Sequence, residues 1–436
     1  MKNLTQLSFL LLFAVMSVAA QQEKGIIGSN NWLRNWTEFS PNKTQYGEPT
    51  QILTGNISKD TKLNKKDVYL LLGNVFVTDS TTLSIEPGTV ILGDFKTNGS
   101  LTVSKGCKIV AEGTETDPII FTSNRSVKKE GDWGGLFVLG DAPINKYGNG
   151  SSVNFGLRPS NPENISYGGQ NTKDNSGILK YVRIEFAGKR TKEFGYYNAL
   201  TFAGVGSETQ IENVMVSYCR GNSFNIIGGN TNMSKLVSFR SSTNDYKFNY
   251  GAQSNISNSL AIRSPYISGT ETSRCIYIAS YDNKEEVDFA KKGTAIVARN
   301  LTLVNVSDNL ASDISVGLVK AAVFIDNDAS LDMGKSVISG FNPAVIFSKT
   351  IAVNSENLDR LKFTEMYFNN CKGNIFIENN SNNEDLENWY GNRAFSNVYS
   401  KGDDSETFID LKSTTRPDYR LRINKIIASN EVELDD

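Results

Sequence analysis

Short runs of β-branched, aliphatic and aromatic residues, each broken by turn residues, recur along almost the whole chain and restrict its fold. In residues 68–94 and 100–124 the apolar runs are only a few residues long and end at Gly, Asn, Asp or Pro. No long window places apolar residues at helical spacing. The sequence therefore predicts a chain that is almost entirely β.

These runs also repeat at a nearly constant interval. Aligning Val214, Leu236 and Leu260 gives steps of 22 and 24 residues, whereas Val182 to Val214 is 32 and requires an insertion such as residues 189–198, KRTKEFGYYN. Leucine-rich repeats share the period, but their L-x-x-L-x-L pattern is absent. Three short strands per repeat predict a single-stranded parallel β-helix, with Asn at left-handed corners and a rod of roughly 60 Å at about 4.8 Å per coil.

The chain divides into four predicted segments. Residues 1–20 combine Lys2, a short apolar run and small residues, which predicts a signal peptide and no transmembrane anchor after cleavage. Residues 21–66 are expected to form an N-terminal segment and cap, residues 67–350 the parallel β-helix, and residues 351–436 the last coils and a C-terminal cap or tail. The less repetitive residues 30–41 and the tail after Ser355 are expected to close the open ends.

Composition excludes several kinds of chemistry. The 436 residues contain no histidine, which removes Ser-His-Asp, Cys-His and His-zinc sites. With 45 basic and 47 acidic residues the net charge is -2, so no nucleic-acid partner is expected. The four cysteines are too few for a disulfide scaffold, and we interpret them as buried free thiols.

The stretch GDWGGLFVLG, residues 131–140, invites comparison with a phosphate-binding loop. Neither G-x-x-x-x-G-K-[ST] nor G-x-G-x-x-G is present, and no helix-forming stretch follows. We therefore expect a packed corner, in which Gly134 and Gly135 allow a tight turn beside Trp133 and Leu136–Leu139 form the next strand.

Five ordered segments resemble the secreted, Bacteroidetes-type right-handed parallel β-helix proteins of the pectin-lyase-like superfamily. They are residues 73–94, 101–123, 131–145, 167–188 and 198–206. The resemblance implies a right-handed, all-β helix and, in many members, acidic clusters. Here those positions are Gly221, Asn222, Asn225 and Lys247. We therefore expect no metal site and no cofactor.

An enzyme in this superfamily would act on acidic glycans. Hydrolysis needs facing carboxylates, but Asp403 with Asp404, and Asp326 with Asp328, are better explained as tail and turn residues. Lyase chemistry needs a cation to neutralise the uronate and an Arg or Lys as base. The arginines near the repeating strands could form an outward basic ladder or simply be solvated: Arg183, Arg220, Arg240 and Arg263. A polysaccharide lyase-like enzyme remains the alternative function.

The preferred interpretation is an exported, non-catalytic surface or glycan-binding scaffold, in the periplasm, at the cell surface or outside the cell. Several tyrosines in turn-like segments could stack on sugar rings: Tyr167, Tyr196, Tyr197, Tyr246 and Tyr250. The insertion 189–198 mixes cations and aromatic rings, which suits an acidic polysaccharide ligand. The predicted ligand-binding residues are Arg190, Tyr196 and Tyr197 of this loop, with Arg220 and Tyr246 from the following coils.

Overall fold

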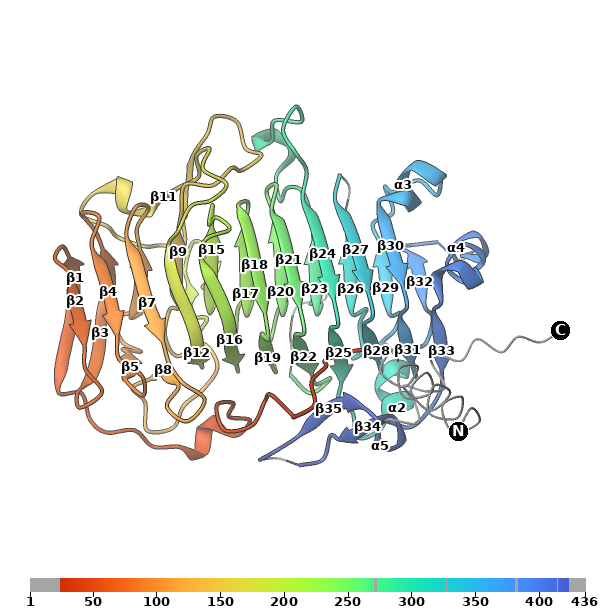
Figure 1. The fold of residues 1–436 in the computed structure, drawn as a ribbon, viewed down its shortest axis with the longest axis horizontal. Helices are drawn as coiled ribbons and strands as arrows, with labels where there is room; N and C mark the ends of the chain where they lie inside the picture. Colours follow the sequence, from red (N-terminus) through yellow and green to blue (C-terminus); the bar gives the residue numbers. More distant parts are fainter. Residues whose placement is uncertain are drawn as a thin grey trace, which may run out of the picture.

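A computed structural model describes residues 24–267, 269, 273–326, 328–380, 383–413 and 415–422. The predicted signal peptide lies outside these residues. Parallel strands stack coil upon coil into a right-handed parallel β-helix, seen from the side as an elongated rod in Figure 1. The predicted fold is confirmed.

Each coil contributes to three sheets, which we number in chain order. Sheet 1 contains β1 (Gln51–Ile57), β3 (Val68–Val77), β5 (Val90–Gly93), β8 (Ile119–Ser123), β12 (Gly177–Glu185), β16 (Gln210–Ser217), β19 (Val237–Phe239), β22 (Leu260–Arg263), β25 (Thr302–Asn305), β28 (Val337–Ser339), β31 (Tyr367–Asn369) and β33 (Val398–Ser400). Sheet 2 contains the second halves of β1 and β3, then β6 (Ser100–Val103), β9 (Leu136–Leu139), β15 (Leu200–Ala203), β17 (Phe224–Ile227), β20 (Tyr246–Asn249), β23 (Ile276–Ile278), β26 (Val323–Ile325), β29 (Val345–Phe347) and β32 (Ile375–Ile377).

Sheet 3 completes each coil and leads into sheet 1. It contains β2 (Thr61–Leu63), β4 (Thr82–Ile85), β7 (Lys108–Glu112), the first halves of β12 and β16, β18 (Asn230–Ser234), β21 (Gln253–Ser257), β24 (Ala295–Arg299), β27 (Ser330–Gly334) and β30 (Leu361–Thr364).

Short elements decorate the rod. The remaining strands are β10 (Ser151–Ser152), β11 (Ser166–Tyr167), β13 (Arg190–Thr191), β14 (Gly195–Tyr196), β34 (Phe408–Asp410) and β35 (Asp418–Leu421). The helices are α2 (Leu310–Ser315), α3 (Ser355–Asp359), α4 (Glu384–Tyr390) and α5 (Asp404–Thr407), with 3-10 turns η1 (Pro41–Lys43), η2 (Pro162–Ile165), η3 (Lys284–Glu286) and η4 (Arg393–Phe395).

The strand register corrects one detail of the repeat. Val182 lies opposite Val214, as the 32-residue step predicts, but Leu260 lies opposite Val237 rather than Leu236. Side chains alternate between the two faces of a strand, so this shift of one residue turns Leu260 outward while Leu236 stays in the core. The cysteines are free thiols, as expected, with three of them buried and Cys371 half-buried.

The stretch 131–140 is a packed corner, as predicted. Trp133 is fully buried and its indole nitrogen donates to the carbonyl of Glu185 at 2.7 Å. A Cβ on Gly93 would lie 2.5 Å from the Trp133 ring, and a Cβ on Gly135 only 2.0 Å from the carbonyl oxygen of Asn198. Both glycines are therefore required by close approach of neighbouring coils.

One end of the rod is closed and the other is open. At the last coils, Leu386 and Tyr390 of α4 are buried in the core, and the Tyr390 hydroxyl donates to the carbonyl of Leu361 at 2.6 Å. At the first coil, Ile52 of β1 is 61% exposed. The helix therefore begins at β1, earlier than residue 67, and within the described residues no element caps this end.

Residues 24–50, which we call the strap, instead run along the outer face of sheet 1. Gly25 donates to the carbonyl of Lys335, Ile27 to the Asn258 side chain and, at the far end of the strap, Thr50 to the carbonyl of Val68. The expectation that residues 30–41 cap an end is therefore wrong. These residues, with the β34–β35 hairpin, bury an apolar face of sheet 1 that would otherwise be exposed (Figure 1).

Candidate functional site

The outer face of sheet 2 is the part of the rod on which a site can be built. In each of its strands the residues on either side of the outward one fill the core, as Ile276 and Ile278 do around Tyr277. The rigid, parallel register therefore stacks the outward side chains of successive coils into a row.

The first half of this face is covered. The segment between β9 and β12, residues 140–176, packs Ile144, Leu157 and Tyr167 into one apolar cluster with Phe76 and Phe137. This insertion is longer than residues 189–198, the insertion that the repeat spacing predicts. A ligand on sheet 2 would therefore lie over the later coils.

The second half of the face carries an outward row of one cation and four apolar residues. The aromatic row consists of Lys247, Tyr277, Phe324, Ile346 and Phe376, from β20, β23, β26, β29 and β32, and none of its members is fully buried. The rings of Tyr277 and Phe324 stack with centroids 5.0 Å apart and planes 25° from parallel. The Lys247 ammonium lies 5.5 Å from the Tyr277 centroid. Half-exposed aromatic rings of this kind suit the apolar faces of sugar rings.

Charged groups flank the row. Asp282 accepts from the Lys247 ammonium at 2.8 Å and from the Asn249 side chain at 2.9 Å. Burial, with the negative charges of Asp326 and Asp282, raises the pKa of Tyr277 to about 12. Tyr277 is therefore protonated at neutral pH and can donate its hydroxyl proton to a sugar oxygen.

The structure brings together three of the five predicted ligand-binding residues. Residues 189–198 form the β13–β14 hairpin, in which the Arg190 guanidinium lies 5.9 Å from the Tyr196 ring centroid. The Arg220 guanidinium lies 5.8 Å from the same ring and forms an ion pair with Glu130. Arg190 is exposed and Tyr196 half-buried, so both can meet a ligand.

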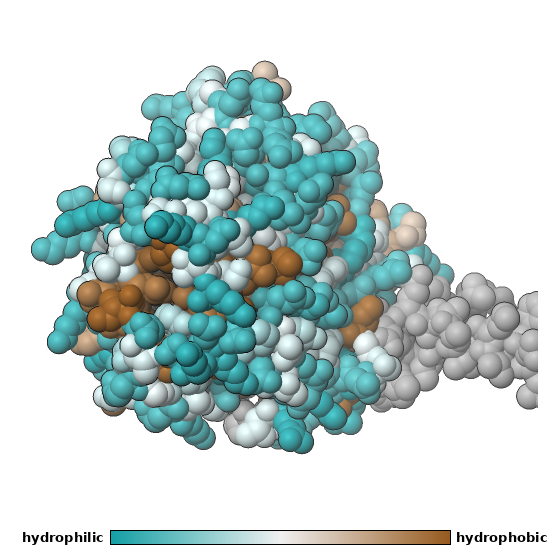
Figure 2. Space-filling model, turned by 60° about the vertical axis from the view of Figure 1, so that its left-hand side comes forward, coloured by the Kyte–Doolittle hydropathy of each residue, from teal (hydrophilic) through white to brown (hydrophobic). Residues whose placement is uncertain are grey.

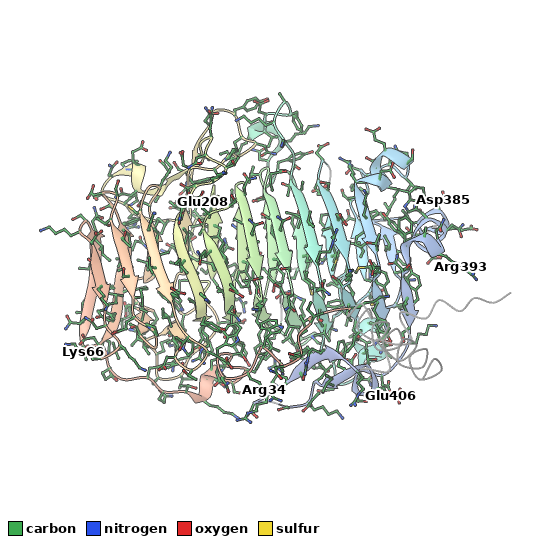
Figure 3. All side chains as sticks on the ribbon, viewed as in Figure 1. Arg34, Lys66, Glu208, Asp385, Arg393 and Glu406 are labelled. Carbon is green, nitrogen blue, oxygen red and sulfur yellow. The ribbon has the colours of Figure 1, made fainter. Side chains whose placement is uncertain are left out.

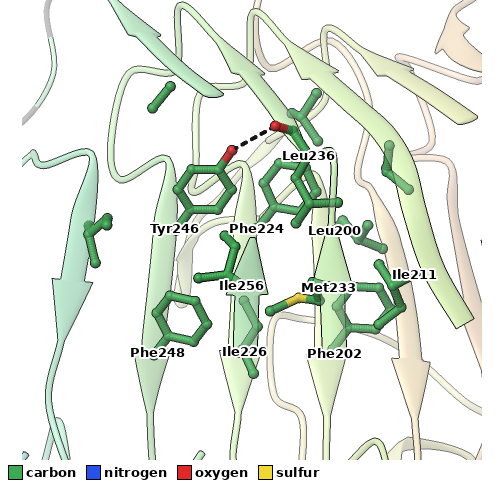
Figure 4. Close-up of a cluster of buried hydrophobic side chains, with 14 of the residues drawn as sticks. Leu200, Phe202, Ile211, Phe224, Ile226, Met233, Leu236, Tyr246, Phe248 and Ile256 are labelled. Carbon is green, nitrogen blue, oxygen red and sulfur yellow. Dashed lines mark hydrogen bonds between the residues drawn. The ribbon is translucent and has the colours of Figure 1, made fainter. Parts of the chain in front are cut away.

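The other two predicted residues lie in the interior. Tyr197 is 1% exposed and packs on Phe137 with centroids 5.8 Å apart. Tyr246 is fully buried, stacks on Phe224 and donates to the carbonyls of Leu260 and Leu236, the latter drawn in Figure 4. Neither can contact a ligand, because Tyr246 faces the core from β20 and Tyr197, which follows β14, belongs to the apolar cluster around Phe137. Tyr167 and Tyr250 are buried as well.

The arginines do not form an outward basic ladder. Arg183 is buried and its Nε lies 3.3 Å from a carboxylate oxygen of Glu185. Arg263 donates at 2.9 Å to Asp245, which is fully buried. Arg240 lies over the ring of Phe239, 5.2 Å from its centroid. These guanidiniums are engaged in intramolecular contacts.

Amide side chains line the corner around Asn222. Asn222 donates to the Asn198 side chain at 2.8 Å and accepts from Asn244 at 2.9 Å, so the three form a ladder between coils. Across the described ranges no three Asp, Glu or Cys residues are grouped closely enough to hold a metal ion. Asp328 has a φ of 56°, in keeping with its interpretation as a turn residue.

The aromatic row was missed from the sequence, although a signal was present. The strands read I-Y-I at 276–278, V-F-I at 323–325, V-I-F at 345–347 and I-F-I at 375–377, each with a large apolar residue at the outward position. In a strand with one face buried and the other exposed to solvent, apolar and polar residues alternate along the sequence. Four consecutive departures from that alternation indicate an exposed apolar row.

A right-handed parallel β-helix with a half-buried aromatic row on one sheet defines the class of protein. The family model described as pectate-lyase-like beta helix domain matches residues 55–408, and the chain belongs to this family. A search among curated proteins found no match. None of the helices in the described part of the chain has the length and hydropathy of a membrane span.

Proposed function

We propose that the protein is an exported, non-catalytic scaffold that binds an acidic polysaccharide along the aromatic row. The stacked Tyr277–Phe324 pair carries the proposal, because it presents two adjacent rings on successive coils of a rigid sheet. Membership of a pectate-lyase-like family supports a polysaccharide as the ligand. Lys2 and the apolar run that follows it support export.

The row has the dimensions of a polymer site. From β20 to β32 it crosses four coil steps, about 19 Å at about 4.8 Å per step. Lys247 at its first position would exchange its partner Asp282 for a uronate or sulfate group of the ligand. The hairpin residues Arg190 and Tyr196 would extend the same ligand toward the earlier coils.

The first experiment screens the mature chain against an array of acidic and neutral glycans and repeats the best ligand with Tyr277→Ala/Phe324→Ala. The double variant should bind at least tenfold more weakly, because each stacking ring contributes roughly 1–3 kcal/mol to the free energy of binding. The matched control is Tyr399→Ala, an aromatic residue that is 42% exposed on sheet 1. Equal binding by the double variant and the parent would place the site elsewhere.

A second pair of variants locates the ligand on the rod. Arg190→Ala/Tyr196→Ala removes the hairpin contacts while leaving the aromatic row intact. We expect a smaller loss than with the row variant, because the hairpin lies beyond the open half of sheet 2. A larger loss would make the hairpin the main site.

Lyase activity is the second candidate function. Burial, with the neighbouring charge of Arg263, lowers the pKa of Arg274, and the charge of Arg274 acts in turn on Tyr277, so a guanidinium adjoins the aromatic row. A lyase would release a product with the ultraviolet absorbance of an unsaturated uronate. We expect no such absorbance with polyuronates. Its appearance would show that the protein is a lyase and would contradict the proposal of a non-catalytic scaffold.

A further inference from the structure

The open end of the rod is an unpaired strand edge with exposed apolar residues. Strand β1 pairs with β3, and no strand in the described ranges pairs with its other edge. Ile52 and Leu72 are 61% and 37% exposed, while Leu53 and Ile57 are only partly covered. Figure 2 turns this end toward the viewer and shows apolar patches within a hydrophilic surface. Such an edge is a template for another strand.

Cations surround this edge. Lys59, Lys62, Lys65 and Lys66 are exposed, against only Asp60 and Asp67 among residues 58–67. Lys66 projects at this end of the rod in Figure 3. Within the described residues, Lys59 and Lys66 form no ion pair. The edge therefore favours a partner strand that carries negative charge.

Residues 423–436, which lie outside the described part of the chain, have this character. Their sequence is INKIIASNEVELDD, with four acids against Lys425. Glu431, Val432, Glu433 and Leu434 alternate acidic with apolar residues at the period of a strand. One face of such a strand could cover the exposed core while the other brings carboxylates to the lysines.

We propose that residues 423–436 of a second copy of this chain add as a β-strand to the free edge of β1. Main-chain hydrogen bonds would supply affinity, and the pairing of acids with lysines would fix orientation and register. The contact is head-to-tail, so each copy is both donor and acceptor. Such a heterologous interface extends into linear assemblies unless its rotation closes a ring.

Residues 423–436 are too few both to reach the first coil of their own rod and to pair along the whole of β1. Arg422 donates to the carbonyl of Thr407 at 2.9 Å, and Asp404 accepts from Ser339 of β28 at 2.9 Å, which places the last described residue near the level of β28. From β28 to β1 sheet 1 descends through β25, β22, β19, β16, β12, β8, β5 and β3, about 43 Å.

The length of residues 423–436 decides whether the donor strand comes from the same copy of the chain or from another. If seven of the fourteen tail residues pair with the seven-residue strand β1, the seven that remain span at most about 25 Å. This is well short of the distance along the rod. The donor strand must therefore come from another copy.

The test uses full chains that have lost one half of the contact. Lys59→Glu/Lys66→Glu removes the acceptor charge and Glu431→Lys/Glu433→Lys the donor charge. In sedimentation velocity the parent should gain mass with protein concentration and lose it at high salt. Each variant alone should stay monomeric over the same range, with an apparent Kd at least about tenfold weaker. Melting temperatures check that both variants fold.

Mixing provides the decisive comparison. The two variants together should assemble, because the parental donor of one fits the parental acceptor of the other and the two reversed halves also fit each other. The fourfold charge swap should restore assembly for the same reason. Lys349→Glu/Lys362→Glu, exposed cations near the closed end, should assemble as the parent does. A monomeric parent, a mixture that stays monomeric, or an acceptor variant that assembles normally would overturn the proposal.

Discussion

Single residues in the left-handed conformation turn the chain from sheet 3 into sheet 1. These corner residues have φ between 46° and 57° and are Tyr181, Asn213, Lys235, Asn258, Asn300, Lys335 and Glu365. Asn suits this conformation because its short side chain tolerates a positive φ, as expected from the sequence. Tyr, Lys and Glu occupy the same corners with backbone strain that the stacked coils impose.

Replacing Lys335 by Asn should relieve part of this strain. A non-glycine residue in the left-handed region costs roughly 1–2 kcal/mol, of which Asn recovers about 0.5–1 kcal/mol. Chemical denaturation of Lys335→Asn should show that increase in the free energy of unfolding. Lys349→Asn, an exposed residue outside these corners, should leave it unchanged. A destabilised Lys335→Asn would mean that the lysine side chain stabilises its corner.

Glu185 links stability to pH. Its carboxylate is 1% exposed beneath the strap, beside Arg183 and near Glu38 and Lys128, and burial raises its pKa to about 7. Because the folded chain binds this proton more tightly than the unfolded chain, its stabilising contribution is full below pH 4.5 and lost as pH rises through 7.

Glu185→Gln should therefore flatten the pH dependence of the free energy of unfolding between about pH 5 and 7. Denaturant titrations across this range measure the slope for the parent and the variant. The control is Glu112→Gln, an exposed residue on sheet 3, which should keep the parental slope. An unchanged slope in Glu185→Gln would assign the pH dependence to other groups.

At the scale of elements, local patterns were predictable and distant contacts were not. The corner around Trp133 could be predicted because its glycines and the following apolar strand are adjacent in sequence. The strap could not, because its contacts join Gly25 to Lys335 across more than 300 residues. Tyr246 was misassigned because a tyrosine near a turn suits both a packed and an exposed position, and only the register that sets it opposite the buried Phe224 shows that it faces inward.

The strap should contribute strongly to stability. Trp36 is fully buried, lies 5.9 Å from the ring of Tyr181 and stacks on Trp32. Trp36→Ala should lower the free energy of unfolding by about 3–5 kcal/mol, as for other buried aromatic residues. Val353→Ala, a residue 39% exposed, is the control. A loss below about 1 kcal/mol would show that the strap is not required for the stability of the rod.

At the scale of the whole molecule, different parts of the rod carry different kinds of surface. The closed end and the strap complete the core, the open end offers an unpaired edge, and the later half of sheet 2 presents the aromatic row. Because successive coils are held at one spacing, a ligand on this row meets equivalent positions in sequence. The polysaccharide proposed as the ligand would therefore lie on a rigid platform.

The dependence of affinity on ligand length tests this account most directly. Calorimetric titration of the mature chain with acidic oligosaccharides of increasing length should show affinity rising until the ligand spans about 19 Å, the length of the aromatic row, and then levelling. In Tyr277→Ala/Phe324→Ala affinity should fall at every ligand length, and its rise with length should be lost. Affinity independent of length in the parent, or an equal rise in the double variant, would contradict a polysaccharide site on the aromatic row.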